Sequence, residues 1–206
     1  MGIYDRKMKT VVAYILAGGR SSRMGRDKAL LQLAGKPLIA RAVELAHEVT
    51  GNVKIVGEPE KLAAYAAVVA DVYRDRGPLG GIHAALRESE AELNLILAVD
   101  LPYIPARFLE YLLTRAESSN AAVTVPFLAG YFQPLCAVYS KQFLSPAERA
   151  LAEGRNKIDQ LFGEVMLCAI SEKDMAASGF NSSIFRNLNT PEDWEQAVHD
   201  FAQDSD

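Results

Sequence analysis

The stretch AYILAGGRSSRMGRDKALL, residues 13–31, joins an apolar run to a loop that is rich in glycine and positive charge. The run itself, VVAYILA, begins at residue 11 and is short enough to be a strand that is buried on both faces. Gly18 and Gly19 end the run, and glycine permits positive φ and a close approach of the backbone to a ligand. Four cations follow within nine residues, against the single acid Asp27: Arg20, Arg23, Arg26 and Lys28.

This basic loop predicts a bound phosphate. Crowded cations repel one another unless an anion joins them, and arginine and lysine donate charge-assisted hydrogen bonds to phosphate oxygens. The alternative is a tight turn with solvated charges. The spacing matches neither a P-loop nor a dinucleotide-binding fingerprint, so neither P-loop hydrolysis nor hydride transfer follows from it.

Strand-like and helix-like segments alternate along the rest of the chain, which predicts an α/β fold with a mostly parallel sheet covered on both faces. In such sheets, ligands bind beyond the carboxyl ends of the strands. The Gly18–Gly19 loop, Asp71 and Asp100 all fall at predicted strand ends. We expect strands at 11–17, 52–57, 67–71, 93–100, 121–126, 134–139 and 164–170, and helices from 38, at 58–66, after 77–81, and at 104–117, 143–154, 157–163 and 190–202.

Asp100 ends the apolar run LNLILAVD, and a carboxylate there suits Mg²⁺, which in nucleotide sites takes one or two carboxylates plus phosphate oxygens. The alternative is a helix cap. Asp71 can accept hydrogen bonds from a base or ribose, or pair with Arg74 or Arg76. The segment GPLGG, residues 77–81, offers a close backbone approach to a flat ligand or simply starts a helix, and His83 beside it is a candidate for lining the site.

Composition limits the alternatives. The chain has 206 residues, a net charge of −4 and two cysteines, Cys136 and Cys168. We expect a single domain over 1–206, with an N-terminal tail at 1–10 and a frayed end at 203–206. The charge argues against nucleic acid and membrane surfaces as partners, and the cysteine content fits a reducing cytoplasm. The early apolar run is too short for a membrane span and ends in Gly-Gly rather than at a cleavage site.

The segment LAGGRSSRMGRDKALL resembles the signature of nucleotidyltransferases that activate small molecules with a nucleoside triphosphate. In the same order as in the molybdenum cofactor guanylyltransferases, the MobA-like family, the chain then has GPLGGIHAAL, AVDLPYIP, QPLCAVY and NLNTPEDW. The resemblance covers residues 12–198. It implies a Rossmann-like three-layer fold with a mostly parallel central sheet, of the nucleotide-diphospho-sugar transferase type.

The resemblance also implies a reaction: Mg²⁺-dependent transfer of GMP from GTP to the terminal phosphate of molybdopterin, with release of pyrophosphate. Asp100 would bind both the nucleotide and Mg²⁺. We expect Gly19 and Arg23 to lie around the phosphates, and we take Lys28, Arg23 and Asp100 as the catalytic residues. Carried over by position, the nucleotide-binding residues are Leu16, Ala17, Gly18, Lys28, Asp71 and Asp100.

Several alternatives stay open at this stage. Related cytidylyltransferases carry LAAG where this chain has LAGG, so Gly18, which leaves room for a purine, favours GTP over CTP. Other small-molecule-phosphate nucleotidyltransferases and a non-catalytic nucleotide-binding module are further alternatives. Many family members have asparagine where this chain has Gly57 and Glu58, so no contact is assigned there. Asn187 and Asn189 resemble a segment on the pterin side or serve as turn and helix caps, and proteins that deliver or accept the cofactor are further possible partners.

Overall fold

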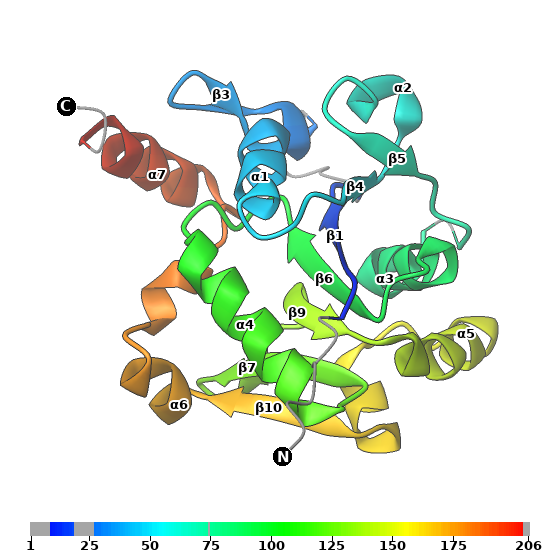
Figure 1. Cartoon of the computed structure of the whole chain (residues 1–206). Coiled ribbons are helices and arrows are strands. Elements are labelled where there is room, and N and C mark those ends of the chain that lie inside the picture. Colours follow the sequence, from blue (N-terminus) through cyan, green and yellow to red (C-terminus); the bar gives the residue numbers. More distant parts are fainter. Residues whose placement is uncertain (1–8, 19–26, 74, 204–206) are drawn as a thin grey trace, which may run out of the picture.

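Among residues 9–18, 27–73 and 75–203, which this computed structural model describes, eight strands form a central sheet (Figure 1). They are β1 Val11–Leu16, β4 Val53–Val56, β5 Ala67–Val69, β6 Leu93–Ala98, β7 Val123–Leu128, β8 Tyr131–Phe132, β9 Cys136–Tyr139 and β10 Leu167–Ser171. The strand order is β10-β7-β9-β6-β1-β4-β5, with β8 paired to β7. The pairs β6–β1, β1–β4, β4–β5 and β7–β10 are parallel, whereas β9 is antiparallel to both β6 and β7. The predicted mostly parallel sheet is therefore confirmed.

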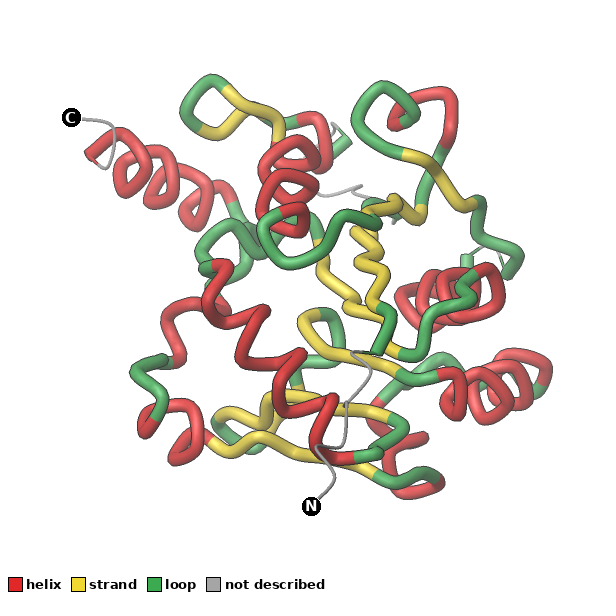
Figure 2. Tube along the Cα trace, in the orientation of Figure 1, coloured by secondary structure: helices red, strands yellow, loops and turns green. Residues whose placement is uncertain are grey.

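Helices cover both faces of this sheet, with the strands in the middle (Figure 2). The helices are α1 Leu38–His47, α2 Pro59–Leu62, α3 Gly77–Glu88, α4 Ala106–Ser119, α5 Leu144–Ala152, α6 Glu172–Ala177 and α7 Pro191–Gln203. Alternate residues of β1 face opposite sides, as a strand requires. Ala13 and Ile15 pack in the core beneath α1 and α4, while Tyr14 and Leu16 pack in the core beneath α3 and α5. These two cores make the fold a three-layer one.

The four parallel strands β6, β1, β4 and β5 end at the same level. Leu16 is in register with Val56 on one side and with Ala98 on the other, and Val56 is in register with Val69. These four residues are the last of their strands. Whatever follows them is therefore presented along one edge of the sheet.

The structure differs from the predicted elements in several places. β5 ends at Val69, two residues before Asp71, and GPLGG forms the first turn of α3 rather than a loop before it. α7 includes Gln203, the first of the residues expected to be frayed, and Thr10, the last residue of the expected N-terminal tail, bonds to Glu92. The pattern missed the hairpin of β2 (Gln32–Leu33) and β3 (Lys36–Pro37), and also β8 and α6, because each is too short to show a hydrophobic period.

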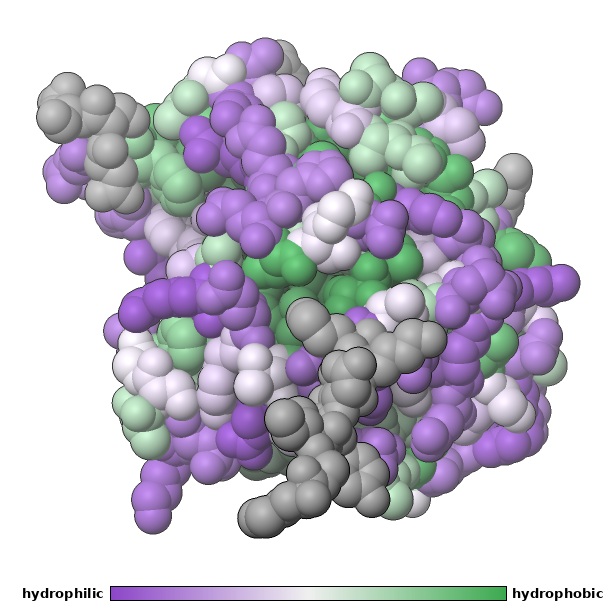
Figure 3. Space-filling model, viewed as in Figure 1, coloured by the Kyte–Doolittle hydropathy of each residue, from purple (hydrophilic) through white to green (hydrophobic). Residues whose placement is uncertain are grey.

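The outer surface is polar on the face seen in Figure 3, where apolar residues gather in a hollow between α1 and α4. Cys136 is buried and Cys168 is half-buried, and both are free thiols. Within the described ranges, no helix combines the length and the hydropathy that a membrane crossing requires.

His83 lies in the hydrophobic core. It does not line the edge of the sheet where the parallel strands end. It is fully buried in α3, its ring is edge-on to Tyr73 at 5.0 Å, and its Nε2 is 3.9 Å from Glu148 Oε1, beyond hydrogen-bond reach. Neither ring nitrogen has a hydrogen-bond partner among the described residues. Burial lowers the pKa of His83. The negative charge of Glu148 acts in the opposite direction, and its effect is smaller.

We expect His83→Leu to stabilise the protein and to weaken its sensitivity to acid. The unfolded chain protonates this histidine below about pH 6.5, whereas the folded chain resists protonation, so stability is lost as the pH falls below that value. Leucine also removes an unpaired buried polar group that costs roughly 1–3 kcal/mol. Urea denaturation between about pH 5 and about pH 8 measures the free energy of unfolding.

The control is His47→Gln, which removes an exposed histidine on α1 and so tests whether the effect belongs to the buried one. An unchanged pH dependence in His83→Leu would contradict the account.

Candidate active site

An ion pair between Lys28 and Asp100 lies at the carboxyl end of β6. Lys28 Nζ is 2.6 Å from Asp100 Oδ2, and the two side chains are 16% and 24% exposed. Lys28 begins a short 3-10 helix, η1 (Lys28–Leu30), which Asp27 caps by accepting from the backbone N–H of Ala29. Asp100 lies two residues beyond β6 and was expected to be its last residue. Lys28 and Asp100 are 72 residues apart in the sequence. The structure therefore brings together the cation and the carboxylate that the sequence indicated as site residues.

The C-terminal segment completes this cluster. Asn189 Oδ1 accepts from Lys28 Nζ at 3.0 Å, and the N–H of Leu188 donates to the carbonyl of Asp100 at 3.3 Å. The cap of α7 holds Asn189 in place, because Asp193 accepts from the N–H groups of Asn189 and Thr190. The bond from Thr190 is the main reason that the pKa of Asp193 is lowered.

The side chains of Asn189 and Thr190 have different partners. Thr190 caps α7 by accepting from the N–H of Asp193 at 3.1 Å, as the sequence predicted. The side chain of Asn189 is directed to Lys28, so it belongs to the cluster. Asn187 is exposed.

The end of β1 supplies the glycine beside this pair. Leu16 is buried, Ala17 donates its N–H to the carbonyl of Val56 at 3.0 Å, and Gly18 is exposed. Gly18 does not have a positive φ, so what glycine provides here is room and not backbone freedom. A Cβ built at Gly18 would meet no atom of the described residues within 4 Å. The remaining residues predicted for this loop lie outside the described residues: Gly19, Arg20, Arg23 and Arg26.

Asp71 lies two residues beyond β5, the outermost of the four parallel strands that end at this edge of the sheet. Its Oδ1 accepts from the N–H of Tyr73 at 2.9 Å. Its carboxylate packs against the first turn of α3, where a Cβ on Gly80 would lie 3.0 Å from Oδ2 and 2.9 Å from the carbonyl oxygen of Tyr73. The missing side chain at Gly80 therefore lets α3 approach the carboxylate.

Asp71 and Asp100 are too far apart to share one metal ion. Three strand spacings separate β5 from β6, which is about 14 Å, whereas Mg²⁺ holds its ligands at about 2 Å. In the part of the chain that the structure describes, no group of three or more histidines, cysteines and acids could hold a metal ion. A metal at Asp100 would need oxygens from a ligand as well as from the protein.

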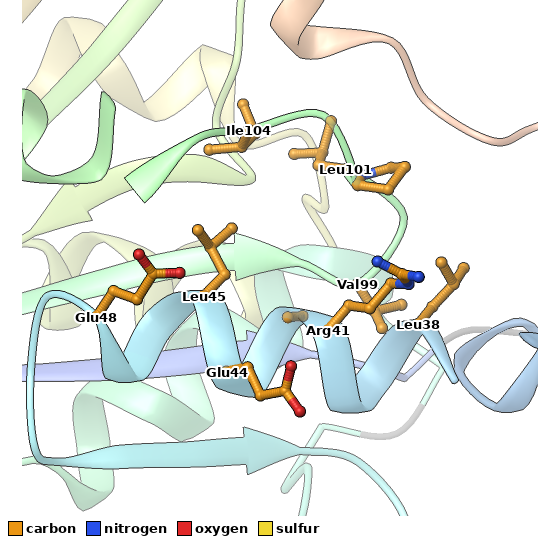
Figure 4. Close-up of a pocket in the computed structure, with 10 residues that line it drawn as sticks. Leu38, Arg41, Glu44, Leu45, Glu48, Val99, Leu101 and Ile104 are labelled. Atoms are coloured by element: carbon orange, nitrogen blue, oxygen red, sulfur yellow. The ribbon is translucent and has the colours of Figure 1, made fainter. Parts of the chain in front are cut away.

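A shallow groove of about 210 Å³ lies behind the Asp100 loop, between α1 and residues 99–104. In Figure 4, Leu45 of α1 points across it toward Leu101 and Ile104. Two of its three charged side chains already have partners in the protein: Arg41 donates to the carbonyl of Leu33 and stacks on Phe201, and Glu44 pairs with Lys36. The third, Glu48, is an exposed acid that would repel a phosphate, so the strand ends remain the candidate site.

Sequence comparison identifies the family at this point. A family model described as the MobA-like NTP transferase domain matches residues 13–166. The chain belongs to the MobA-like NTP transferase family. It is similar to the molybdenum cofactor guanylyltransferase of Desulfosudis oleivorans, with 35% identity over 193 residues that cover 92% of this chain and 95% of the relative.

Solved structures agree with this assignment. The chain is similar to molybdopterin-guanine dinucleotide biosynthesis protein A from Archaeoglobus fulgidus, with a TM-score of 0.82 and 26% identity, covering 94% of this chain and 100% of that one. It also matches 2-C-methyl-D-erythritol 4-phosphate cytidylyltransferase from Thermus thermophilus, with a TM-score of 0.69 and 13% identity, over 93% and 98% of the two chains. The second match shows the fold alone. The family expected from the motifs and the nucleotidyltransferase class are both confirmed.

Sequence reasoning missed Lys61. Lys61 Nζ lies 2.8 Å from Glu58 Oε2 and 3.5 Å from Asp27 Oδ2, so it joins the end of β4 to the residue before Lys28. Its three-residue spacing from Glu58 was visible in the sequence. The contact with Asp27 was not visible, because it depends on how α2 folds back over the strand ends.

Gly80→Ala should weaken nucleotide binding about tenfold, a change of about 1.4 kcal/mol. The substitution should change stability little, because overpacking costs about 1–3 kcal/mol while alanine stabilises a helix by about 1 kcal/mol relative to glycine. The carboxylate of Asp71 must nevertheless move to make room for the new Cβ. Calorimetric titration with nucleoside triphosphate measures the effect. The control is Gly51→Ala, where a Cβ meets no described atom within 4 Å, and equal affinities in the two variants would argue against a role for Asp71.

Proposed function

We propose that this chain transfers GMP from GTP to the terminal phosphate of molybdopterin, with Mg²⁺, to form the guanine dinucleotide form of the cofactor and pyrophosphate. The observation that carries the proposal is the Lys28–Asp100 pair beside the open end of β1, in a chain whose relatives are guanylyltransferases. A carboxylate and a lysine at adjoining strand ends suit a metal-bound triphosphate. They also argue against a non-catalytic module, which needs neither group.

Asp100 fits the requirement for Mg²⁺. It is a half-buried carboxylate whose ion-pair partner among the described residues is an ammonium on a long, flexible side chain. A nucleotide offers Lys28 a stronger anion, so Lys28 can move to the phosphates and leave the carboxylate to the metal. Mg²⁺ bound there would neutralise charge on the phosphates.

The reaction then requires little further from the protein. An oxygen of the acceptor phosphate forms a bond to the α-phosphorus of GTP, and the bond from that phosphorus to the oxygen bridging to the β-phosphorus breaks. GMP is transferred and pyrophosphate leaves. Lys28, together with Arg23, offsets charge on the triphosphate and the leaving group. A phosphate monoester is largely deprotonated at neutral pH, so no general base is needed.

Asn189 extends the site toward the acceptor. Its amide oxygen bonds to Lys28 in the ligand-free protein, and its backbone is fixed by the cap of α7. When Lys28 turns to the phosphates, the amide of Asn189 becomes available to a second substrate. We assign the acceptor phosphate to this side of Lys28, and the base to the side of Gly18 and Asp71.

Lys28→Ala and Asp100→Ala should each lower turnover about 100-fold or more, as removal of a group that stabilises transition-state charge does. The assay is pyrophosphate release with GTP, Mg²⁺ and molybdopterin, with thermal unfolding as the check on folding. Lys36→Ala is the matched control, because it breaks an exposed pair with Glu44 away from the strand ends. Near-normal turnover in either site variant would refute the assignment.

Gly18→Ala should reduce the preference for GTP over CTP. The new methyl group meets no described atom, so the fold tolerates it and its effect falls on the bound base. Thermal stabilisation by GTP and by CTP, each with and without Mg²⁺, measures this, since a ligand raises stability by binding the folded state. We expect the larger shift with GTP and Mg²⁺ in the unmodified protein. Equal shifts with both nucleotides would remove the case for guanine.

A further inference from the structure

Lys61 lies on the β4 side of the strand ends, opposite the Lys28–Asp100 pair. It belongs to α2, and its ammonium is 2.8 Å from Glu58 Oε2 and 3.5 Å from Asp27 Oδ2. These contacts raise its pKa, the hydrogen bond to Glu58 most of all. Lys61 is therefore a fixed positive charge between two carboxylates that come from different strand-end loops.

Asp27 links Lys61 to the active-site lysine. One carboxylate oxygen of Asp27 accepts from the N–H of Ala29 and so sets the start of η1, while the other faces Lys61. Lys28 is the next residue in the chain and the first of η1. The position of the Lys28 backbone thus depends on Asp27, and Lys61 holds the outward oxygen of Asp27.

The contacts form a series of alternating charge that passes around the open end of β1. It runs from the end of β4 to the end of β6, through side-chain contacts and one backbone step: Glu58, Lys61, Asp27, Lys28 and Asp100. Gly18 lies between these two strand ends, because β1 is the strand between β4 and β6. A triphosphate at this position would meet the negative charge of Asp27 next to Lys28, and Lys61 balances that charge.

The energy of such contacts argues against a purely structural role. The side chains of Lys61, Asp27 and Glu58 are 44%, 32% and 66% exposed. Exposed pairs contribute little to stability. Their effect on a ligand can be larger, because charge-assisted hydrogen bonds are stronger than neutral ones and depend on where the donor is held.

We propose that Lys61 is a positioning residue for nucleotide binding, which fixes and neutralises Asp27 so that Lys28 is presented to the triphosphate. The proposal rests on the proposed function in one respect, that a metal-bound polyphosphate binds at the strand ends. It does not depend on which base or acceptor is used.

The test compares Lys61→Ala with the matched control Lys36→Ala. Lys36 forms a pair of similar exposure, 43% against 60% for Glu44, on the β2–β3 hairpin and α1. We expect Lys61→Ala to weaken binding of both GTP and inorganic tripolyphosphate, each with Mg²⁺, by about tenfold. KM for GTP should rise by a similar factor while kcat changes less than about twofold. Lys61→Arg should restore the affinity, and Lys36→Ala should leave it unchanged.

A double-mutant cycle separates positioning through Asp27 from a direct contact with the nucleotide. Asp27→Asn keeps the acceptor for Ala29 and removes the charge that Lys61 faces. In that background, we expect Lys61→Ala to cause no further loss of tripolyphosphate affinity. Additive losses, or a Lys61→Ala variant that behaves like Lys36→Ala, would overturn the proposal.

The two probes also separate this proposal from the proposed function. If tripolyphosphate binds but GTP is not preferred and no pyrophosphate is released, the guanylyl assignment fails and the cycle still decides the role of Lys61. If the unmodified protein binds neither probe, both proposals are wrong.

Discussion

The ion pair between Lys28 and Asp100 connects three parts of the chain that are distant in sequence. Lys28 belongs to the segment after β1, Asp100 follows β6, and Asn189, which also bonds to Lys28, precedes α7. Because the pair is mostly buried, its charges depend on each other more than an exposed pair would. Under the proposed function, a metal-bound triphosphate would bring a cation for the carboxylate and an anion for the ammonium, so both charges would remain compensated when they separate.

This pair can form only because the parallel strands end at one level. The register of β6, β1, β4 and β5 presents Asp100, Gly18, Glu58 and Asp71 in that order along a single edge. Strand spacing separates β5 from β6 by about 14 Å, so the two carboxylates have different surroundings. Asp100 pairs with Lys28, whereas Asp71 is packed on α3 through Gly80. A one-residue change of register would direct these loops to different levels and separate the site.

Much of this arrangement was predictable from the sequence, and the exceptions have physical reasons. The apolar runs of β1 and β6 predicted strands of the sheet. The Gly18–Gly19 loop, Asp71 and Asp100 at predicted strand ends indicated a site at the sheet edge. The contact of Asn189 with Lys28 and that of Lys61 with Asp27 were not predictable, because each joins segments whose approach depends on tertiary packing. Short elements such as β2, β3 and α6 also escaped, since a few residues show no hydrophobic period. For Gly18 the sequence predicted both backbone freedom and room for a base; the structure shows no positive φ there, and at Gly80 the absence of a side chain lets α3 approach Asp71.

The most direct test of the account locates the metal. Mn²⁺ can replace Mg²⁺ in the complex with GTP, and its anomalous scattering marks its position in a crystal. The account predicts a single strong peak at the carboxylate of Asp100, with Lys28 released from that carboxylate and directed to the phosphates. A peak at Asp71 or in the groove beside α1, or an intact Lys28–Asp100 pair in the presence of bound nucleotide, would contradict it.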